Sequence, residues 1–278
     1  MNWHVTISGL TQRLGMSRQN FYRECIAQQR AEVDEGFVLA LVIAERAVQP
    51  RIGVRKLYII LTPILESEGI KLGRDKLFDL LRKNDLLVPP LPKSSTRTTW
   101  FEPCLPVFCN LVIGLELTGP NQAWAADITY IRTNEKFLYL SLITDMWSRK
   151  IVGFHLGDSL EAAEAVLALD MALPTLRPGE KPLHHSDRGC QYASHLYVGK
   201  LREAGLQISM TEELHCYENA LAERVNGILK QEYYLSSCFK NKAQAKAAVE
   251  QAVYLYNTRR PHMSLGYQTP EKMHQRTT

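Results

Sequence analysis

The stretch Ala123-Trp-Ala-Ala-Asp-Ile-Thr-Tyr-Ile131 decides how the rest of the chain is interpreted. Its apolar and β-branched residues are typical of a buried strand, and Asp127 stands in the middle of it. A carboxylate in such a strand is costly unless it is paired with an opposite charge or bound to a metal ion. The sequence therefore predicts a metal ligand at Asp127, in preference to a strand-end aspartate that caps a loop.

Two further carboxylates stand in informative surroundings. Asp187 ends a second short strand at 183–186, and Gly189 supplies the turn after it. Glu223 lies in a segment with helical spacing, and 35 residues separate it from Asp187. Three oxygen ligands on rigid elements suit a pair of Mg²⁺ ions, or Mn²⁺ as the alternative, in phosphoryl transfer. The three residues thus predict a catalytic site of a DNA-cutting and DNA-joining enzyme.

Other residues compete for these roles. Glu212, Glu213 and Glu218 are rival third ligands, although they precede the helix and are expected to be less well fixed than Glu223. His184 and His185 could be transition-metal ligands, but adjacent strand residues point to opposite faces. At least one of these two histidines is therefore expected in the core.

The predicted helix around Glu223 carries a polar stripe formed by Asn219, Glu223, Asn226 and Lys230. Such a stripe is usually a solvated face. Here it would also direct the carboxylate of Glu223 toward the active cleft and the ammonium group of Lys230 toward a phosphate backbone. Both interpretations are open at this stage.

The order of the predicted elements indicates the fold. Three antiparallel strands are followed by alternating helices and strands, which is the order of a ribonuclease-H-like α/β core. We expect strands at 124–132, 137–145, 150–156, 183–186 and 207–211, and helices at 161–173, 194–205, around Glu223 and at 242–257. The core is assigned to residues 121–237, and a C-terminal helix with a basic, irregular tail to 238–278.

Residues 1–88 are predicted to be helical throughout. Gly15 breaks a first helix and Ser17 caps a second, and a longer helix covers about 34–48. The two helices on either side of Gly15 are a first helix-turn-helix candidate, and helices at 54–68 and 74–83 form a second. An all-α DNA-binding domain is therefore expected, with a plain helical domain as the alternative. Residues 89–120 form a proline-rich linker, which could contact phosphates or serve as a tether.

Charge is unevenly distributed along the chain. Residues 123–223 hold nine Lys/Arg against fourteen Asp/Glu, whereas 51–100 hold ten against five and 224–278 hold nine against three. This pattern fits a metal site between DNA-holding surfaces, although chance clustering on solvated faces would look the same. The predicted DNA contacts are Arg18, Arg55, Lys56, Arg74, Lys76, Lys230, Arg259 and Arg260.

Scattered cysteines without a Cys-x-x-Cys pair argue against a structural zinc and are typical of a reducing cytosol. The first residues lack a basic and apolar leader, and the longest apolar run, 37–44, is far shorter than the ~20 residues of a membrane span. A cytoplasmic protein without a membrane partner is expected.

Several stretches resemble the retroviral-integrase-like DDE transposases encoded by the second reading frame of the IS-three type insertion sequences. The resemblance covers almost the whole chain, and both the aspartate–glutamate spacing and a basic residue seven positions after Glu223 fit the family. The matching stretches are Asn121-Gln-Ala-Trp-Ala-Ala-Asp-Ile-Thr-Tyr-Ile131, Asp145-Met-Trp-Ser-Arg-Lys-Ile-Val-Gly153, His185-Ser-Asp-Arg-Gly-Cys-Gln-Tyr192, Cys216-Tyr-Glu-Asn-Ala-Leu-Ala-Glu223, Tyr256-Asn-Thr-Arg-Arg-Pro-His-Met-Ser-Leu-Gly-Tyr-Gln-Thr-Pro270 and the segment from Arg51 to Leu87.

The resemblance implies that Asp127, Asp187 and Glu223 bind the metal ions, and that the protein cleaves and transfers DNA strands at the ends of its own element. Its partners would be double-stranded DNA (terminal repeats and target), further copies of the chain, and the product of an upstream frame with a helix-turn-helix and a leucine zipper. No sustained heptad is seen here. A truncated frame product that binds element ends without cutting them is therefore the alternative function.

Overall fold

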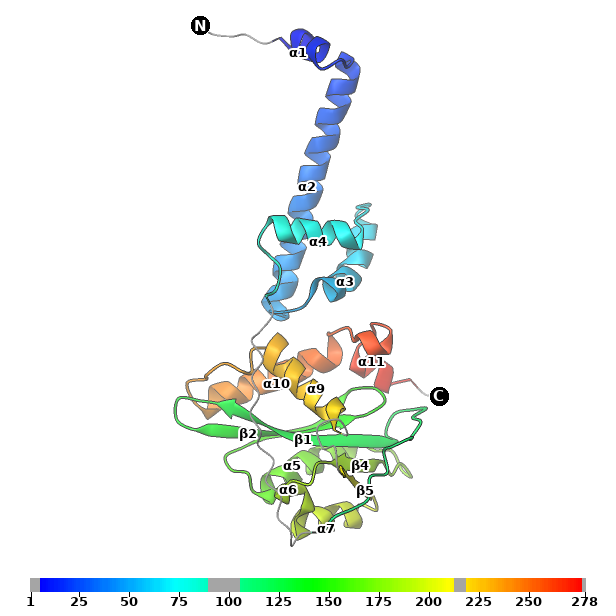
Figure 1. The fold of residues 1–278 in the computed structure, drawn as a ribbon, viewed down its shortest axis with the longest axis vertical. Helices are drawn as coiled ribbons and strands as arrows, with labels where there is room; N and C mark the ends of the chain where they lie inside the picture. Colours follow the sequence, from blue (N-terminus) through cyan, green and yellow to red (C-terminus); the bar gives the residue numbers. More distant parts are fainter. Residues whose placement is uncertain (1–5, 90–105, 213–218, 277–278) are drawn as a thin grey trace. The chain divides into compact units, whose positions relative to one another are not determined.

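The computed structural model describes residues 6–89, 106–212 and 219–276. The chain forms two compact units (Figure 1). The first comprises Met1–Val48 and Gly53–Leu87, and the second comprises Gln49–Ile52 and Val88–Thr278. We call them the helical unit and the sheet unit. No helix among the described residues combines the length and the apolar content that crossing a bilayer requires.

The helical unit begins with α1 (Ile7–Arg13) and α2 (Arg18–Val48). Gly15 between them has a positive φ of 65°, and the Ser17 hydroxyl oxygen accepts a hydrogen bond from the N–H of Asn20 at 3.1 Å, as the sequence predicted. However, α2 is one continuous helix of 31 residues where two helices were expected. The reason is that no proline interrupts it, and a single internal glycine such as Gly36 costs a helix only about 1 kcal/mol.

The second helical pair of this unit follows the sequence-based expectation. Helices α3 (Val54–Ser67) and α4 (Arg74–Lys83) contact each other, and α3 also contacts α2. Gly69 in the turn has a φ of 72°, a conformation that residues with a Cβ rarely adopt. The buried side chains of the three helices include Val38, Val42, Leu57, Leu61, Leu77 and Leu81.

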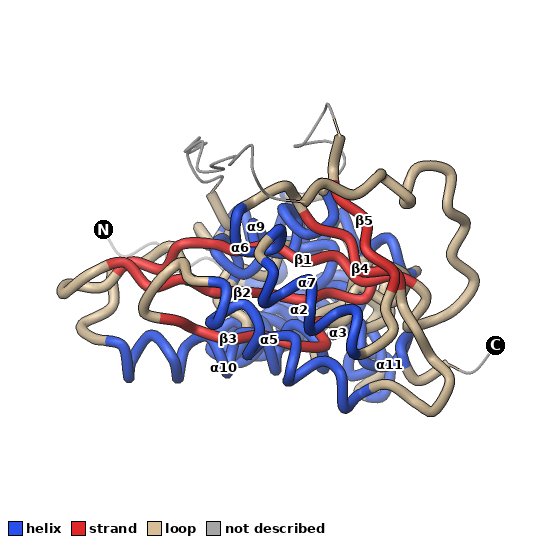
Figure 2. Tube along the Cα trace, turned by 90° about the horizontal axis from the view of Figure 1, so that it is seen from below, coloured by secondary structure: helices blue, strands red, loops and turns tan. Residues whose placement is uncertain are grey.

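The sheet unit is built on five strands in the order β3-β2-β1-β4-β5, which Figure 2 shows edge to edge. β1 pairs antiparallel with β2 and parallel with β4, while β2–β3 is antiparallel and β4–β5 parallel. Because β1 is the central strand, most of its residues are buried, while Asp127, Ile128 and Tyr130 are half-buried. All five strands lie within one residue of their predicted bounds: β1 (Ala123–Arg132), β2 (Phe137–Asp145), β3 (Ile151–Gly157), β4 (Leu183–Ser186) and β5 (Gln207–Met210).

Helices cover both faces of this sheet (Figure 1). On one side lie α5 (Ala162–Ala172), the 3-10 turn η1 (Leu173–Thr175), α6 (Cys190–Ala193) and α7 (His195–Glu203). On the other side lie α9 (Ala220–Glu232), which contacts β1 and β2, and α10 (Lys242–Thr258), which contacts β3. The segment after α10 was expected to be irregular, but it forms η2 (Met263–Leu265) and α11 (Pro270–His274).

The described part of the predicted linker, residues 106–120, contains neither helix nor strand. It is held beside the end of β5, because the N–H of Leu111 donates to Ser209 Oγ and that of Asn110 donates to the carboxylate of Glu212, both at 2.9 Å. Residues 93–99, for which a tether was predicted, lie outside the described residues.

Close packing of β3 on α5 generates a prediction for Gly153. A Cβ at this position would lie 2.2 Å from the carbonyl oxygen of Ala168 and 2.8 Å from Ala172 Cβ. We expect Gly153→Ala to lower the free energy of unfolding by about 3 kcal/mol, measured by chemical denaturation, because the backbone of α5 has to move. The matched control is Gly199→Ala in α7, where a Cβ meets nothing within 4 Å. It should be neutral or stabilising by about 0.5–1 kcal/mol, and equal effects at the two glycines would contradict the packing argument.

Candidate active site

The carboxylate of Asp127 joins the central strand to helix α9. Its Oδ1 accepts a hydrogen bond from the N–H of Ile128 at 2.9 Å, and its Oδ2 accepts one from Asn226 Nδ2 at 2.7 Å. Asn226 is 5% exposed, so this contact is shielded from water. These hydrogen bonds offset part of the cost of placing a charge in an apolar strand.

A second asparagine fixes the beginning of the same helix. Asn219 is buried, and its Nδ2 donates to the carbonyl oxygen of Ala126 at 3.1 Å. Two members of the predicted polar stripe therefore face β1, and the interpretation of this stripe as a solvated face is wrong for Asn219 and Asn226. Glu223, between them in sequence, is exposed in the first turn of α9.

Asp187 follows directly after β4. The parallel register pairs Ala125 of β1 with His185 of β4, and continuing it by two residues brings Asp187 beside Asp127. The Oδ1 atom of Asp187 accepts a hydrogen bond from the N–H of Gly189 at 3.0 Å. A Cβ on Gly189 would lie 2.9 Å from this oxygen, so a larger residue there would displace the carboxylate of Asp187.

The three carboxylates interact electrostatically. Burial, together with the negative charges of Asp187 and Glu223, raises the pKa of Asp127 to about 7, against the opposing effect of the hydrogen bonds from Asn226 and Ile128. Partial burial and the charge of Asp187 also raise the pKa of Glu223. Like charges that affect one another in this way favour a cation among them. Their donor atoms are all oxygen, which fits Mg²⁺ or Mn²⁺.

Lys230 lies near the same charges. Burial lowers the pKa of its ammonium group, and the negative charge of Asp127 opposes this shift without cancelling it. Among the described residues, no three His, Cys, Asp or Glu side chains form a ready-made metal cluster. Of the rival ligands, Glu212 holds the backbone of Asn110, while Glu213 and Glu218 lie outside the described residues.

Both strand histidines are buried. His184 Nε2 lies 2.9 Å from the Tyr197 hydroxyl, and burial lowers the pKa of His184 to about 3. His185 Nδ1 lies 2.9 Å from Ser209 Oγ. Their partners confirm the expectation of at least one core histidine.

Sequence reasoning missed Tyr192, which ends one of the motifs quoted above. It is 3% exposed, and burial together with the charges of Asp127 and Asp187 raises the pKa of its phenol. Its side chain belongs to the apolar core cluster that also contains Trp124 and Tyr197.

The predicted DNA-contacting residues occupy different environments. Arg18, Arg55, Lys76 and Arg259 are exposed, and Lys56 is half-buried. Arg74 is exposed but forms an ion pair with Asp75 at 2.9 Å. Arg260 is 3% exposed and forms a bidentate ion pair with Glu232, so it cannot present its charge to a phosphate backbone. This position corrects the expectation that Arg260 contacts DNA.

The raised pKa of Asp127 generates a prediction about pH. In the unfolded chain this carboxyl ionises near 3.8, but in the folded protein near 7, so the folded state loses stability as the pH rises through this window. Asp127→Asn removes the loss. The variant should resemble the wild type near pH 4 and exceed its free energy of unfolding by about 1–3 kcal/mol at pH 8. Urea denaturation without divalent metal at both pH values measures this, and a difference that is independent of pH would contradict it.

Comparison with known proteins identifies the family. Residues 118–216 and 204–270 match two family models that are both described as an integrase core domain. The chain is 34% identical over 274 residues to the "Insertion element IS600 uncharacterized 31 kDa protein" of Shigella sonnei, covering 96% of this chain and 99% of that one. It is 31% identical over 274 residues to "Transposase InsF for insertion sequence IS3A" of Escherichia coli strain K12, covering 96% and 93%.

The fold has relatives among solved structures. A chain of the simian T-cell lymphotropic virus intasome, solved in complex with PP2A regulatory subunit B56 gamma, matches with a TM-score of 0.52 and 18% identity, over 81% of this chain and 75% of that one. At this identity the match concerns the fold, which is the ribonuclease-H-like integrase core expected from the sequence. The chain therefore belongs to the IS3-type family of DDE transposases, polynucleotidyl transferases built on an integrase core.

Proposed function

We propose that this transposase cleaves and transfers DNA strands at the ends of its insertion sequence, with Asp127, Asp187 and Glu223 as the ligands of two Mg²⁺ ions. All three side chains would supply carboxylate oxygens to the ions. When bound, the ions supply charge stabilisation to the attacking and leaving oxygens of an in-line displacement at phosphorus.

The reaction needs two nucleophiles, neither of which comes from the protein. Water first attacks the phosphodiester at the element end, which breaks the bond between phosphorus and the 3′ oxygen and leaves a 3′ hydroxyl. This hydroxyl then attacks a phosphodiester of the target, forming one P–O bond while another breaks. The residues of the chain orient the phosphate and provide negative charge where cations are needed.

The observation that carries the proposal is that three carboxylates from separate parts of the fold lie close enough to interact. The charges of Asp187 and Glu223 add to burial in raising the pKa of Asp127, and the charge of Asp187 adds to burial in raising that of Glu223. Holding like charges near a buried strand destabilises a fold, so such a cluster is usually retained for a function that needs a cation. The hydrogen bond from Asn226 supports the proposal, because it orients one carboxylate oxygen of Asp127.

Double-stranded DNA is the proposed partner, held by basic side chains outside the acidic centre. Exposed Arg55 and the neighbouring Lys56 in the helical unit and exposed Arg259 in the sheet unit are proposed phosphate contacts, with Lys230 nearer the carboxylates. Further copies of the chain and the product of an upstream frame are proposed as additional partners on DNA.

The catalytic proposal predicts the effect of Asp187→Asn. This change removes one negative charge at nearly constant volume, so folding should survive while Mg²⁺-dependent nicking of an end-containing duplex falls by at least about 100-fold. Binding to terminal-repeat DNA should persist, because the proposed phosphate contacts remain. The assay compares wild type and variant, each supplied with the upstream frame product if one is encoded.

The same assay tests the alternative function. Equal cleavage by both proteins would remove Asp187 from the mechanism. Tight end binding without cleavage by either protein would favour a DNA-binding regulator.

The DNA-holding proposal predicts a change in salt dependence. Replacing Arg55 and Lys56 together by alanine should weaken DNA binding and lower the slope of log K against log salt by about 1–2, because fewer counterions are released. Arg74→Ala is the matched comparison, since this exposed arginine is already paired with Asp75. Its effect on the slope should be smaller. An unchanged slope in the double variant would show that both charges are ordinary solvated surface.

A further inference from the structure

A buried ion pair holds the C-terminal end of α9, the helix that carries Glu223. The last residue of this helix, Glu232, accepts two hydrogen bonds from Arg260, with Nε–Oε2 at 2.7 Å and Nη2–Oε1 at 2.8 Å. The side chains are 18% and 3% exposed, respectively. This fork-to-fork geometry fixes direction as well as distance, which a single hydrogen bond does not.

Arg260 is itself firmly held. Its N–H donates to the carbonyl oxygen of Leu255 at 3.0 Å, and its guanidinium carbon lies 5.8 Å from the ring centroid of Tyr256. Hydrogen bonding to Glu232 raises the pKa of Arg260 despite its burial, so the guanidinium stays charged. The ion pair therefore connects α9 to a rigid point rather than to a mobile side chain.

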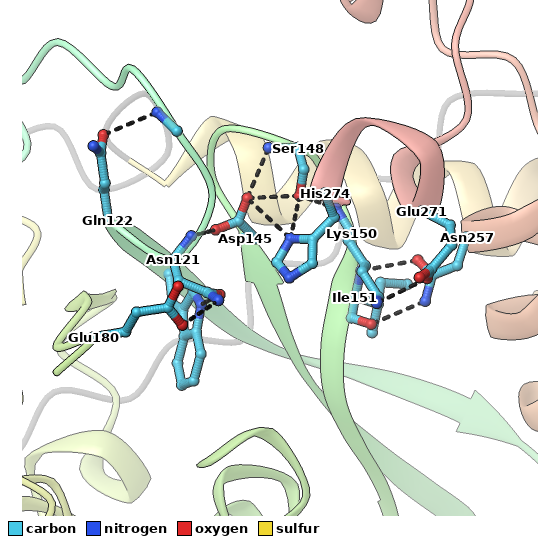
Figure 3. A network of polar contacts seen from close by, with 12 residues as sticks. Asn121, Gln122, Asp145, Ser148, Lys150, Ile151, Glu180, Asn257, Glu271 and His274 are labelled. Atoms are coloured by element: carbon cyan, nitrogen blue, oxygen red, sulfur yellow. Dashed lines mark hydrogen bonds and ion pairs between the residues drawn. The ribbon is translucent and has the colours of Figure 1, made fainter. Parts of the chain in front are cut away.

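That rigid point is anchored on the sheet. Asn257, three residues before Arg260, accepts a hydrogen bond from the N–H of Ile151 at 3.0 Å and donates one to its carbonyl oxygen at 2.9 Å (Figure 3). Nearby, Lys150 forms an ion pair with Glu271 of α11 at 2.8 Å. The end of α10 and the segment after it are thus fixed to the beginning of β3.

The position of Glu232 around the helix gives the ion pair a specific mechanical effect. Asn219, Glu223 and Asn226 lie within about 60° of one another around α9, at ~100° per residue. The two asparagine contacts with β1 come from one stripe of α9, and each is a single hydrogen bond from a flexible side chain, so they resist sliding of the helix more than a small roll about its own axis. Glu232 lies about 120° around the helix from Asn226, so a fixed contact there opposes rolling.

A small roll would matter for Glu223. Side chains extend about 6 Å from a helix axis, so a roll of about 10° displaces the carboxylate by about 1 Å. Catalytic groups need to be held within about 0.5 Å of their working position. We propose that Arg260 is a positioning residue, which fixes the rotation of α9 through Glu232 and thereby the carboxylate of Glu223. This inference rests on the proposed metal-binding role of Glu223.

The test compares two variants that each remove one carboxylate charge from an ion pair of the C-terminal segment. Glu232→Gln removes the negative charge and one of the two acceptor oxygens that hold α9 to Arg260, whereas Glu271→Gln removes the charge that pairs with Lys150 and does not alter α9. For each purified full-length protein, the Mg²⁺ concentration at half of the maximal thermal shift is measured, together with the concentration that half-activates cleavage of an end-containing duplex. We expect Glu232→Gln to raise both concentrations about tenfold, and Glu271→Gln to leave both within about twofold of the wild type.

A third variant separates positioning from stability. Glu232→Gln leaves the buried Arg260 without its counter-charge and could prevent folding. The double variant Glu232→Gln with Arg260→Met removes both charges and leaves an apolar side chain against Tyr256. It should recover most of the thermal stability in the absence of metal, and should still require about tenfold more Mg²⁺ than the wild type.

Glu223→Gln distinguishes failure of the inference from failure of the proposed function. If Glu223→Gln responds to Mg²⁺ as the wild type does, the metal-binding role of Glu223 is wrong. If Glu223→Gln loses the response but the Glu232 variants keep the wild-type Mg²⁺ concentrations, the metal role stands and the positioning role of Arg260 is overturned. The positioning role is also overturned if cleavage by the Glu232 variants falls only in proportion to their folded fraction.

Discussion

The hydrogen bond from Asn226 to Asp127 joins helix α9 to the central strand, and the arrangement of the proposed active site depends on it. Asp127 has to lie in a buried strand to be rigid, yet its charge must not be left uncompensated there. Asn226 satisfies one carboxylate oxygen at 2.7 Å and, on the same helix, Glu223 lies three residues earlier. One contact therefore offsets part of the cost of the charge at Asp127 and also fixes α9, the helix that carries Glu223, against β1. Asn219 adds a second contact, with the backbone of Ala126.

Carboxylates that raise one another's pKa make the metal-free site a source of instability. The surrounding packing offsets this cost. Trp124 and Ala126, on the opposite side of β1 from Asp127, belong to a core cluster shared with α5 and α7. This well-packed layer keeps the strand in place while its other face carries charge. Departures from the best local stability of this kind are typical of functional sites.

The family-like stretches outside the triad serve largely to assemble the sheet unit. Asp145 is fully buried, and its carboxylate accepts hydrogen bonds from the N–H of Asn121 at 2.7 Å and from the N–H and hydroxyl of Ser148 at 2.7 and 2.6 Å (Figure 3). The same Ser148 hydroxyl lies 2.9 Å from His274 Nδ1 in α11. The end of β2 is thereby tied to the beginning of β1 and to the C-terminal helix. These contacts explain why distant motifs are needed for one site.

Local patterns in the sequence predicted the strands and most helices, and they selected the three carboxylates that we propose as metal ligands. Apolar runs mark the strands, and a carboxylate inside one of them needs an opposite charge or a metal ion. Tertiary structure decided which face of α9 meets the sheet and that Arg260 is buried. The partners concerned are 99 residues apart for Asn226 and Asp127, and 28 apart for Arg260 and Glu232. Helical periodicity shows that a polar stripe exists, but the same pattern is expected whether the stripe faces solvent or faces polar groups of the sheet. Only the packed chain brings a specific acceptor within hydrogen-bonding distance, and that contact distinguishes an active-site stripe from a solvated one.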